Sequence, residues 1–316
     1  DYINAINLHL NIYNPLKGFV THKEFVSILQ KKKINNINFT IPINLFCAKD
    51  KANKFRIGEN INLKFKNEIV GILKLESKFE IQKKKFLKKV FGTSSKFHLG
   101  VNAYNEKIKK KKFSIGGKVF IYKNKLKKHF YTNNFITIEK LTKIGKSDTS
   151  FSTRNIPHIG HNLIQKKIID KKKKLTIFLI LGVKNKYNPK ILMNSYKALK
   201  KNKIFRKINI FFIYLPTFFA GPNEAFFQAK IFENMKFKFF YVGRDHAGYK
   251  KFYGKFESQK IFQKFKSKIK IIKFNEPMMC KTCKTCIINK HKIQKSCPIC
   301  KNKNLSELKG SNIKIL

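Results

Sequence analysis

Hydrophobic positions in the first part of the chain form short runs that Gly, Asn and Lys interrupt. Runs of this kind, bounded by turn-forming residues, are typical of strands. They predict strands at residues 41–46, 68–75, 97–101 and 118–122, and a more amphipathic stretch predicts one helix near residues 23–31. Because catalytic residue types are sparse in this part, we expect a β-rich domain at residues 1–135 without the main chemistry.

The pattern changes after about residue 136 to longer apolar runs that alternate with amphipathic stretches. Runs rich in Phe, Ile and Leu predict strands, buried on both faces, at residues 175–183, 207–215 and 237–242. Helices are expected near residues 159–172, 189–201 and 223–235. This alternation predicts a parallel sheet with crossover helices, so we expect a Rossmann-like α/β domain at residues 136–275.

Three unusual short motifs lie at the expected ends of these strands. They are His158-Ile159-Gly160-His161, the tripeptide at 220–222 and the glycine-rich segment at 243–248. Ligands of open parallel sheets bind beyond the carboxyl ends of the strands. We therefore expect the three motifs to meet at one edge of the sheet.

The first motif offers chemistry suited to phosphate. His158 and His161 are three residues apart at a predicted helix start, where free N–H groups attract anions. Histidines at this spacing are more often structural. However, Arg154 precedes them in a chain with four arginines, and its planar guanidinium suits an oxyanion. The combination favours a site that stabilises charge on a departing pyrophosphate.

The segment 243–248 follows a predicted strand with Arg244, Asp245 and His246 between small residues. Small residues allow backbone amides to face a ligand, Arg244 can pair with phosphate, and Asp245 can orient Arg244 or His246.

Five of the six cysteines lie between residues 280 and 300, in two Cys-x-x-Cys pairs with one cysteine between them. Tetrahedral zinc takes paired thiolates from two such turns. We favour Cys280, Cys283, Cys297 and Cys300 as ligands, with Cys286 spare and Cys47 a core thiol. A disulfide set is the less favoured alternative. Four thiolates leave no open position for substrate, so the zinc site of residues 276–316 is expected to be structural.

Composition adds a net charge of +53, carried almost entirely by lysine. The lysines are scattered, so we interpret them as compositional drift and expect no specific nucleic-acid partner. The positive field of the lysines still attracts anions such as ATP and sulfate.

No apolar stretch reaches the roughly 18 to 20 residues that a membrane-spanning helix needs. We expect a cytoplasmic protein without a membrane partner, although the start at Asp1 leaves a processed or incomplete N-terminus open.

Residues 151–161 resemble the ATP sulfurylase signature Phe-Gln-Thr-Arg-Asn-x-Pro-His-x-Gly-His. Residues 220–225 resemble that family's Ala-Gly-Pro-Arg-Glu-Ala, and residues 242–248 match its Val-Gly-Arg-Asp-His-Ala-Gly. The resemblance implies a PUA-like N-terminal domain and a nucleotidyltransferase catalytic domain. The implied reaction joins ATP and sulfate into adenylyl sulfate (APS) and pyrophosphate, by direct attack of sulfate on the α-phosphorus.

The resemblance also implies residue roles. Thr153, Arg154 and Asn155 would form the catalytic strip, His158 and His161 would contact the β- and γ-phosphates, and Ser152, Arg154 and Ala247 would bind sulfate. The nucleotide would be bound by His158 and His161 with Gly243, Arg244, Asp245 and His246. Magnesium would accompany ATP, and the protein would be a homodimer.

The sequence departs from the family pattern at four places. Ser152 replaces a Gln, Phe218 and Asn223 each replace an Arg, and Lys309-Gly310-Ser311 stands where the family has Ser-Gly-Thr. We expect the first three to affect sulfate affinity and turnover more than the fold.

Three alternative functions stay open: another nucleotidyltransferase with the His-x-Gly-His motif, a family member that no longer turns over, and a basic zinc-ribbon protein that binds nucleic acid. The direction of the reaction in the cell is also open.

Overall fold

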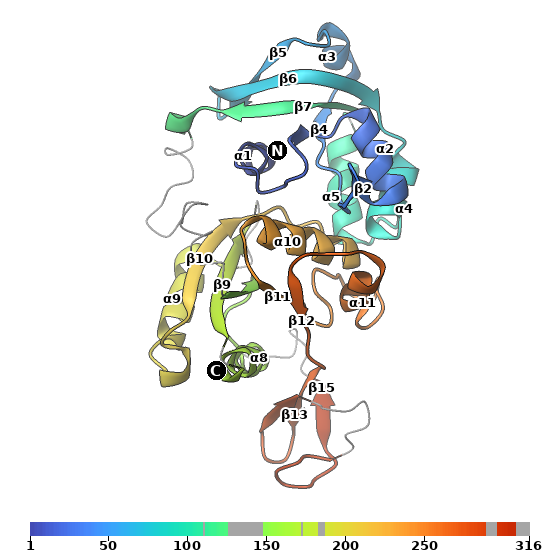
Figure 1. Cartoon of the computed structure of the whole chain (residues 1–316). Helices are drawn as coiled ribbons and strands as arrows, with labels where there is room; N and C mark the ends of the chain where they lie inside the picture. The colour runs from blue at the N-terminus through green and yellow to red at the C-terminus, as the bar shows by residue number, and fades with distance from the viewer. Residues whose placement is uncertain (110, 126–147, 172, 183–186, 289–295, 308–316) are drawn as a thin grey trace.

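The computed structural model describes residues 1–109, 111–125, 148–171, 173–182, 187–288 and 296–307. The expected domain boundary between residues 135 and 136 and the tripeptide Lys309-Gly310-Ser311 lie outside the described residues. Figure 1 shows three parts, with the N-terminal domain at the top, a second sheet with its helices in the middle and a small cysteine-rich part at the bottom.

The N-terminal domain is built on a five-stranded antiparallel sheet. Its strand order is β1-β7-β6-β5, and β4 also pairs with β7. The long central strand β6 alternates buried and exposed positions over much of its length, as a strand with one covered face does. The strands are β1 (Gly18–Phe19), β4 (Leu45–Cys47), β5 (Asn60–Phe65), β6 (Glu68–Glu80) and β7 (Phe113–Ile121), and a separate hairpin pairs β2 (Lys33–Ile34) with β3 (Ile37–Asn38).

This domain contains more helix than the sequence pattern predicts. The helix expected near 23–31 is confirmed as α2 (His22–Lys31), where Thr21 and Glu24 form a capping box. The strand expected at 97–101 is wrong, because this segment starts helix α5 (Leu99–Ile108). The ring Nδ1 of His98 accepts the Val101 N–H and caps that helix. The other helices are α1 (Tyr2–His9), α3 (Lys49–Lys54) and α4 (Lys83–Phe91).

The second sheet is parallel throughout, as predicted, with the order β10-β9-β8-β11-β12. The first strand in sequence, β8, therefore lies between the second and the fourth. The chain turns to the other half of the sheet at this point, and open α/β sheets bind ligands beside such a switch. The strands are β8 (Asp148–Thr153), β9 (Lys174–Leu181), β10 (Asn209–Tyr214), β11 (Phe239–Tyr241) and β12 (Lys270–Ile272).

The predicted alternation of strands and helices holds along this domain. Helices α8 (Ile159–Asp170), α9 (Pro189–Leu199) and α10 (Pro222–Asn234) agree with the predicted helices to within about three residues. The predicted strands contain β10 and β11 and cover β9 except for its first residue. A short 3-10 helix, η1 (Lys203–Phe205), and helix α11 (Glu257–Lys264) complete the connections. Helix α10 is buried on nearly all sides, since it lies between the second sheet and the N-terminal domain.

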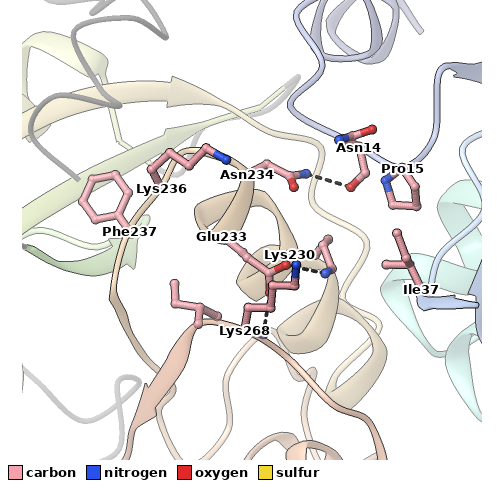
Figure 2. A pocket seen from close by; sticks show the side chains of 10 residues that line it. Asn14, Pro15, Ile37, Lys230, Glu233, Asn234, Lys236, Phe237 and Lys268 are labelled. Carbon is pink, nitrogen blue, oxygen red and sulfur yellow. Dashed lines mark hydrogen bonds and ion pairs between the residues drawn. The ribbon is translucent and has the colours of Figure 1, made fainter. Parts of the chain in front are cut away.

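The N-terminal domain and the parallel sheet share one hydrophobic core. The ring of Phe227, on α10, packs against Tyr13 with centroids 5.0 Å apart and against Phe39 at 5.5 Å. Figure 2 shows another part of this junction, where the Asn234 side chain donates to the Asn14 carbonyl over 2.8 Å beside a cavity of about 460 Å³. This packing fixes α10 between the two domains.

The cysteine-rich part forms a small antiparallel sheet in the order β14-β13-β15. Its strands are β13 (Pro277–Cys280), β14 (Cys286–Ile288) and β15 (Leu305–Glu307), and β13 and β14 contact helix α8. Across the described residues, the structure contains no helix long and apolar enough to cross a membrane.

Candidate active site

A cavity of about 630 Å³ opens where strands β8 and β11 end. The structure brings together in its wall every site residue predicted from the sequence, apart from the cysteines. These are Ser152, Thr153, Arg154, Asn155, His158, His161, Gly243, Arg244, Asp245, His246 and Ala247. The domain-junction cavity of Figure 2 contains none of them. The first and third motifs therefore meet at one edge of the sheet, as predicted, whereas residues 220–222 of the second motif do not line the cavity.

The two histidines of the first motif lie together at the start of helix α8. His158 is the N-cap residue, and its ring Nδ1 accepts the backbone N–H of His161 over 3.4 Å. The two rings are stacked at a tilt of 32°, with centroids 3.8 Å apart. Burial, and then the neighbouring His158, lower the pKa of His161 to about 3. Its Nδ1 atom is buried and has no hydrogen-bond partner among the described residues.

Arg154 lies just beyond strand β8. Its guanidinium carbon lies 4.8 Å from the centroid of the Phe219 ring, so the cation stacks on an aromatic face. Burial lowers the pKa of Arg154, and the nearby Glu224 carboxylate opposes that shift. Local hydrogen bonds hold the residues on either side, because the Asn155 N–H donates to Thr153 Oγ1 over 3.0 Å. The arrangement presents a preorganised cation at the edge of the sheet.

Gly221 is required at the turn into helix α10. Its φ is +51°, in the region that side-chain-bearing residues rarely adopt. A Cβ atom there would also lie 2.7 Å from the ring of Tyr253. Tyr253 is fixed in turn, because its hydroxyl donates to the carbonyl of Phe219 over 3.0 Å. The second motif thus needs glycine for both backbone conformation and space.

The third motif forms a tight loop after strand β11. Arg244 forms ion pairs with Asp245 beside it and with Glu276, where the cysteine-rich part begins. The Gly221 N–H donates to the Ala247 carbonyl over 3.0 Å, which connects the second and third motifs. Burial, and then Arg154, lower the pKa of His246 to about 4.

Only one of the three described departures from the family pattern lies in the cavity wall. Ser152 lines the cavity, whereas Phe218 is 5% exposed and packs on Phe227 in the core. The Asn223 side chain points to the N-terminal domain and donates to the Val90 carbonyl over 2.8 Å. The two missing arginines therefore correspond to positions in a domain contact and in the core.

Four cysteines gather into a possible metal site, and they are the four favoured from their spacing. The sulfur atoms of Cys280, Cys283, Cys297 and Cys300 all lie within 4.8 Å of one another. The Cys280–Cys300 and Cys283–Cys297 sulfur pairs are 3.5 and 3.7 Å apart. Tetrahedral zinc with bonds of about 2.3 Å requires sulfur separations of about 3.8 Å, so the set fits that metal. Cys286 is not a member of the group, and Cys47 is buried in the N-terminal core.

Several cavity residues were not predicted from the sequence. Glu224 and Gln228 come from helix α10, Phe219 precedes it, and Glu276 follows strand β12. A signal was present for two of them, because Glu224 and Gln228 are four residues apart on one face of a helix that is otherwise largely apolar. No local pattern distinguishes Phe219 in a chain with 32 phenylalanines.

Comparison with known proteins agrees with the fold. The ATP-sulfurylase family model matches residues 137–316, and a PUA-like domain model matches residues 2–124. A sulfate adenylyltransferase of Pyrococcus abyssi is 31% identical, over 89% of this chain and 75% of that protein. One from Carboxydothermus hydrogenoformans is 30% identical, over 99% of this chain and 83% of that protein.

A solved structure, described as a hexameric APS kinase from Thiobacillus denitrificans, has a similar fold, with a TM-score of 0.67 at 13% identity. The match covers 98% of this chain and 56% of that one, so this chain spans little more than half of its length. The family model covers more than half of the chain, and the two relatives named above extend the similarity through the N-terminal domain. This chain belongs to the ATP-sulfurylase family.

Proposed function

We propose that the cavity beside strands β8 and β11 performs the sulfate adenylyltransferase reaction by direct transfer. One oxygen of sulfate attacks the α-phosphorus of ATP, in line with the bond to the departing group. That phosphorus–oxygen bond breaks, its electron pair leaves with pyrophosphate, and the new bond completes adenylyl sulfate. The observation that carries this proposal is that Arg154, the His158–His161 pair and the 243–248 loop line one cavity.

The two histidines are proposed to bind the β- and γ-phosphates. His158 accepts a backbone N–H at Nδ1, so its neutral ring carries the proton on Nε2 and can donate it to phosphate. The N-terminus of α8 adds its own partial positive charge. As charge builds on pyrophosphate, donors that are already in place stabilise it more than mobile water does.

Sulfate is proposed to lie against Arg154. The stacked Phe219 ring holds the guanidinium, and the Thr153–Asn155 turn fixes the backbone on both sides. Ser152 and the backbone N–H of Ala247 complete the proposed contacts. Placing the oxyanion beside a preorganised fork aligns its oxygen with the α-phosphorus, which supplies the orientation that this transfer needs.

The nucleotide is proposed to bind along the 243–248 loop. Gly243 leaves room for it, and Arg244, Asp245 and His246 supply polar groups. ATP enters as its magnesium complex, so the metal is part of the substrate and shields the charge of the phosphates. Zinc is proposed in the four-cysteine site, where it would hold the β13–β15 unit against helix α8 and take no part in the transfer.

Two expectations from the sequence and the family resemblance remain predictions. They are a homodimer and a cytoplasmic location. Light scattering on the purified protein measures the first, and fractionation of the source cells measures the second.

The reaction is tested by pyrophosphate release from magnesium ATP. Release should require sulfate and fall when Arg154 is replaced by Lys, because an ammonium cannot reproduce the planar fork. Release that is the same with and without sulfate would argue against the proposal and favour another nucleotidyltransferase.

A further inference from the structure

The side chain of Gln228 occupies a position between two predicted site residues. It projects from helix α10, is 6% exposed and lines the cavity. Its Oε1 atom accepts from the Ser152 hydroxyl over 3.1 Å and lies 2.9 Å from Nε2 of His246. One carbonyl oxygen therefore connects strand β8, through Ser152, with the loop after β11, through His246.

The orientation of this carboxamide is fixed from the other side. Gln228 Nε2 donates to Oε1 of Glu224, one helical turn earlier, over 3.3 Å. The second carboxylate oxygen of Glu224 accepts the N–H groups of Phe218 and Ala220 over 3.2 and 3.1 Å. Burial raises the pKa of Glu224, whereas the Arg154 cation and these donors oppose that rise and favour the carboxylate, which can only accept. The amide nitrogen must therefore face Glu224, and the amide oxygen must face Ser152 and His246.

This orientation selects one tautomer of His246. The amide oxygen can only accept, so the imidazole atom 2.9 Å away must carry the proton. His246 is thereby held with its proton on Nε2 and with Nδ1 unprotonated. Its backbone is fixed as well, because Ser258 Oγ donates to the His246 carbonyl over 2.8 Å.

The neighbouring strand explains why the amide comes from α10. The family motif places a glutamine at position 152, where this chain has serine. Here the Ser152 hydroxyl and the His246 ring are connected through the Gln228 carbonyl oxygen, which contacts both. We propose that Gln228 is a positioning residue that takes the place of the absent glutamine at 152, holding Ser152 and His246 at the sulfate side of the cavity.

This inference rests on the proposed function for its kinetic part only. Gln228→Met keeps the length of the side chain and removes the amide. We expect the KM for sulfate to rise about tenfold, the effect of one lost hydrogen bond, and the KM for magnesium ATP to change less than about threefold. Ser152→Gln combined with Gln228→Ala should bring the KM for sulfate back to within about threefold of wild type, since the longer side chain can fill the vacated space.

Two kinetic results would overturn the proposal. One is an unchanged KM for sulfate in Gln228→Met. The other is a double variant whose KM for sulfate rises by the combined effect of Gln228→Ala and Ser152→Gln measured separately. Thermal unfolding of each variant separates these outcomes from loss of the fold.

A spectroscopic test is independent of activity. In protein with ¹⁵N-labelled histidine, two-bond proton–nitrogen spectra distinguish the tautomers of His246. Wild type should show the Nε2–H form, and Gln228→Met should show a mixture with the Nδ1–H form. A wild-type ring protonated on Nδ1, or an unchanged tautomer in Gln228→Met, contradicts the proposal even if the enzyme is active. An inactive wild type with the expected tautomer contradicts the proposed function instead.

Discussion

Arg244 and Glu276 form an ion pair that joins the glycine-rich loop to the start of the cysteine-rich part. The Arg244 side chain is 16% exposed and that of Glu276 is 13% exposed, whereas the second partner of Arg244, Asp245, is 54% exposed. The two carboxylates thus differ in how much water screens them. The same cation is held by one largely buried partner and one solvated partner.

Replacing Glu276 with Gln should lower the free energy of unfolding by about 1–3 kcal/mol, because it leaves a largely buried cation with less compensation. Asp245→Asn is the matched control, and its effect should stay below about 1 kcal/mol because that partner is solvated. Urea denaturation of the three proteins measures both values. Equal losses in the two variants would show that burial does not distinguish the pairs.

Acid should destabilise the protein through two histidines of the cavity, His161 and His246, because their surroundings disfavour the charged ring. The pKa of His161 is lowered to about 3 and that of His246 to about 4, against about 6.5 in an unfolded chain. Between these values the unfolded state binds more protons, so stability is full above about pH 6.5 and falls as the pH drops towards 4. For each histidine, the free energy of unfolding falls by up to about 1.4 kcal/mol for every pH unit between its unfolded and its folded pKa.

The contribution of His161 is isolated by comparison with His161→Gln. As the pH falls from 7 to 4, wild type should lose stability relative to this variant, because glutamine takes up no proton. Urea denaturation at several pH values provides the comparison. A difference between the two proteins that does not change with pH would refute burial of a neutral His161.

Gly221→Ala should destabilise the protein by about 2–4 kcal/mol, combining strain at positive φ with a clash against Tyr253. Gly182→Ala is the matched control, because a Cβ there meets its nearest atoms at 3.7 and 3.8 Å. That substitution should cost less than about 1 kcal/mol. Thermal unfolding ranks the two, and a Gly221 variant as stable as the Gly182 variant would contradict the packing described here.

Zinc analysis of the purified protein should find one ion per chain. Cys297→Ser should lose it and unfold at a lower temperature, because binding energy at a structural zinc site stabilises the fold. Cys286→Ser should keep it, since that sulfur is outside the four-cysteine group. Elemental analysis by mass spectrometry measures the zinc content of both variants. Retention of zinc by Cys297→Ser would exclude the proposed ligand set.

The sequence predicted the parallel sheet and the placement of its motifs well, because strands buried on both faces leave long apolar runs such as the one that forms β9. Short runs were less informative. Residues 97–101 could be strand or helix by periodicity, and the cap formed by His98 decided for helix. The contacts of Gln228 could not be predicted, because they depend on how helix α10 packs against β8 and the loop after β11.

ATP formation from adenylyl sulfate and pyrophosphate is the most direct test that one cavity carries out the transfer. The account predicts that wild type forms ATP and that His161→Ala, with its fold verified by thermal unfolding, is slower by at least about a hundredfold, the scale for one lost transition-state donor. An unchanged rate in His161→Ala would contradict the central claim.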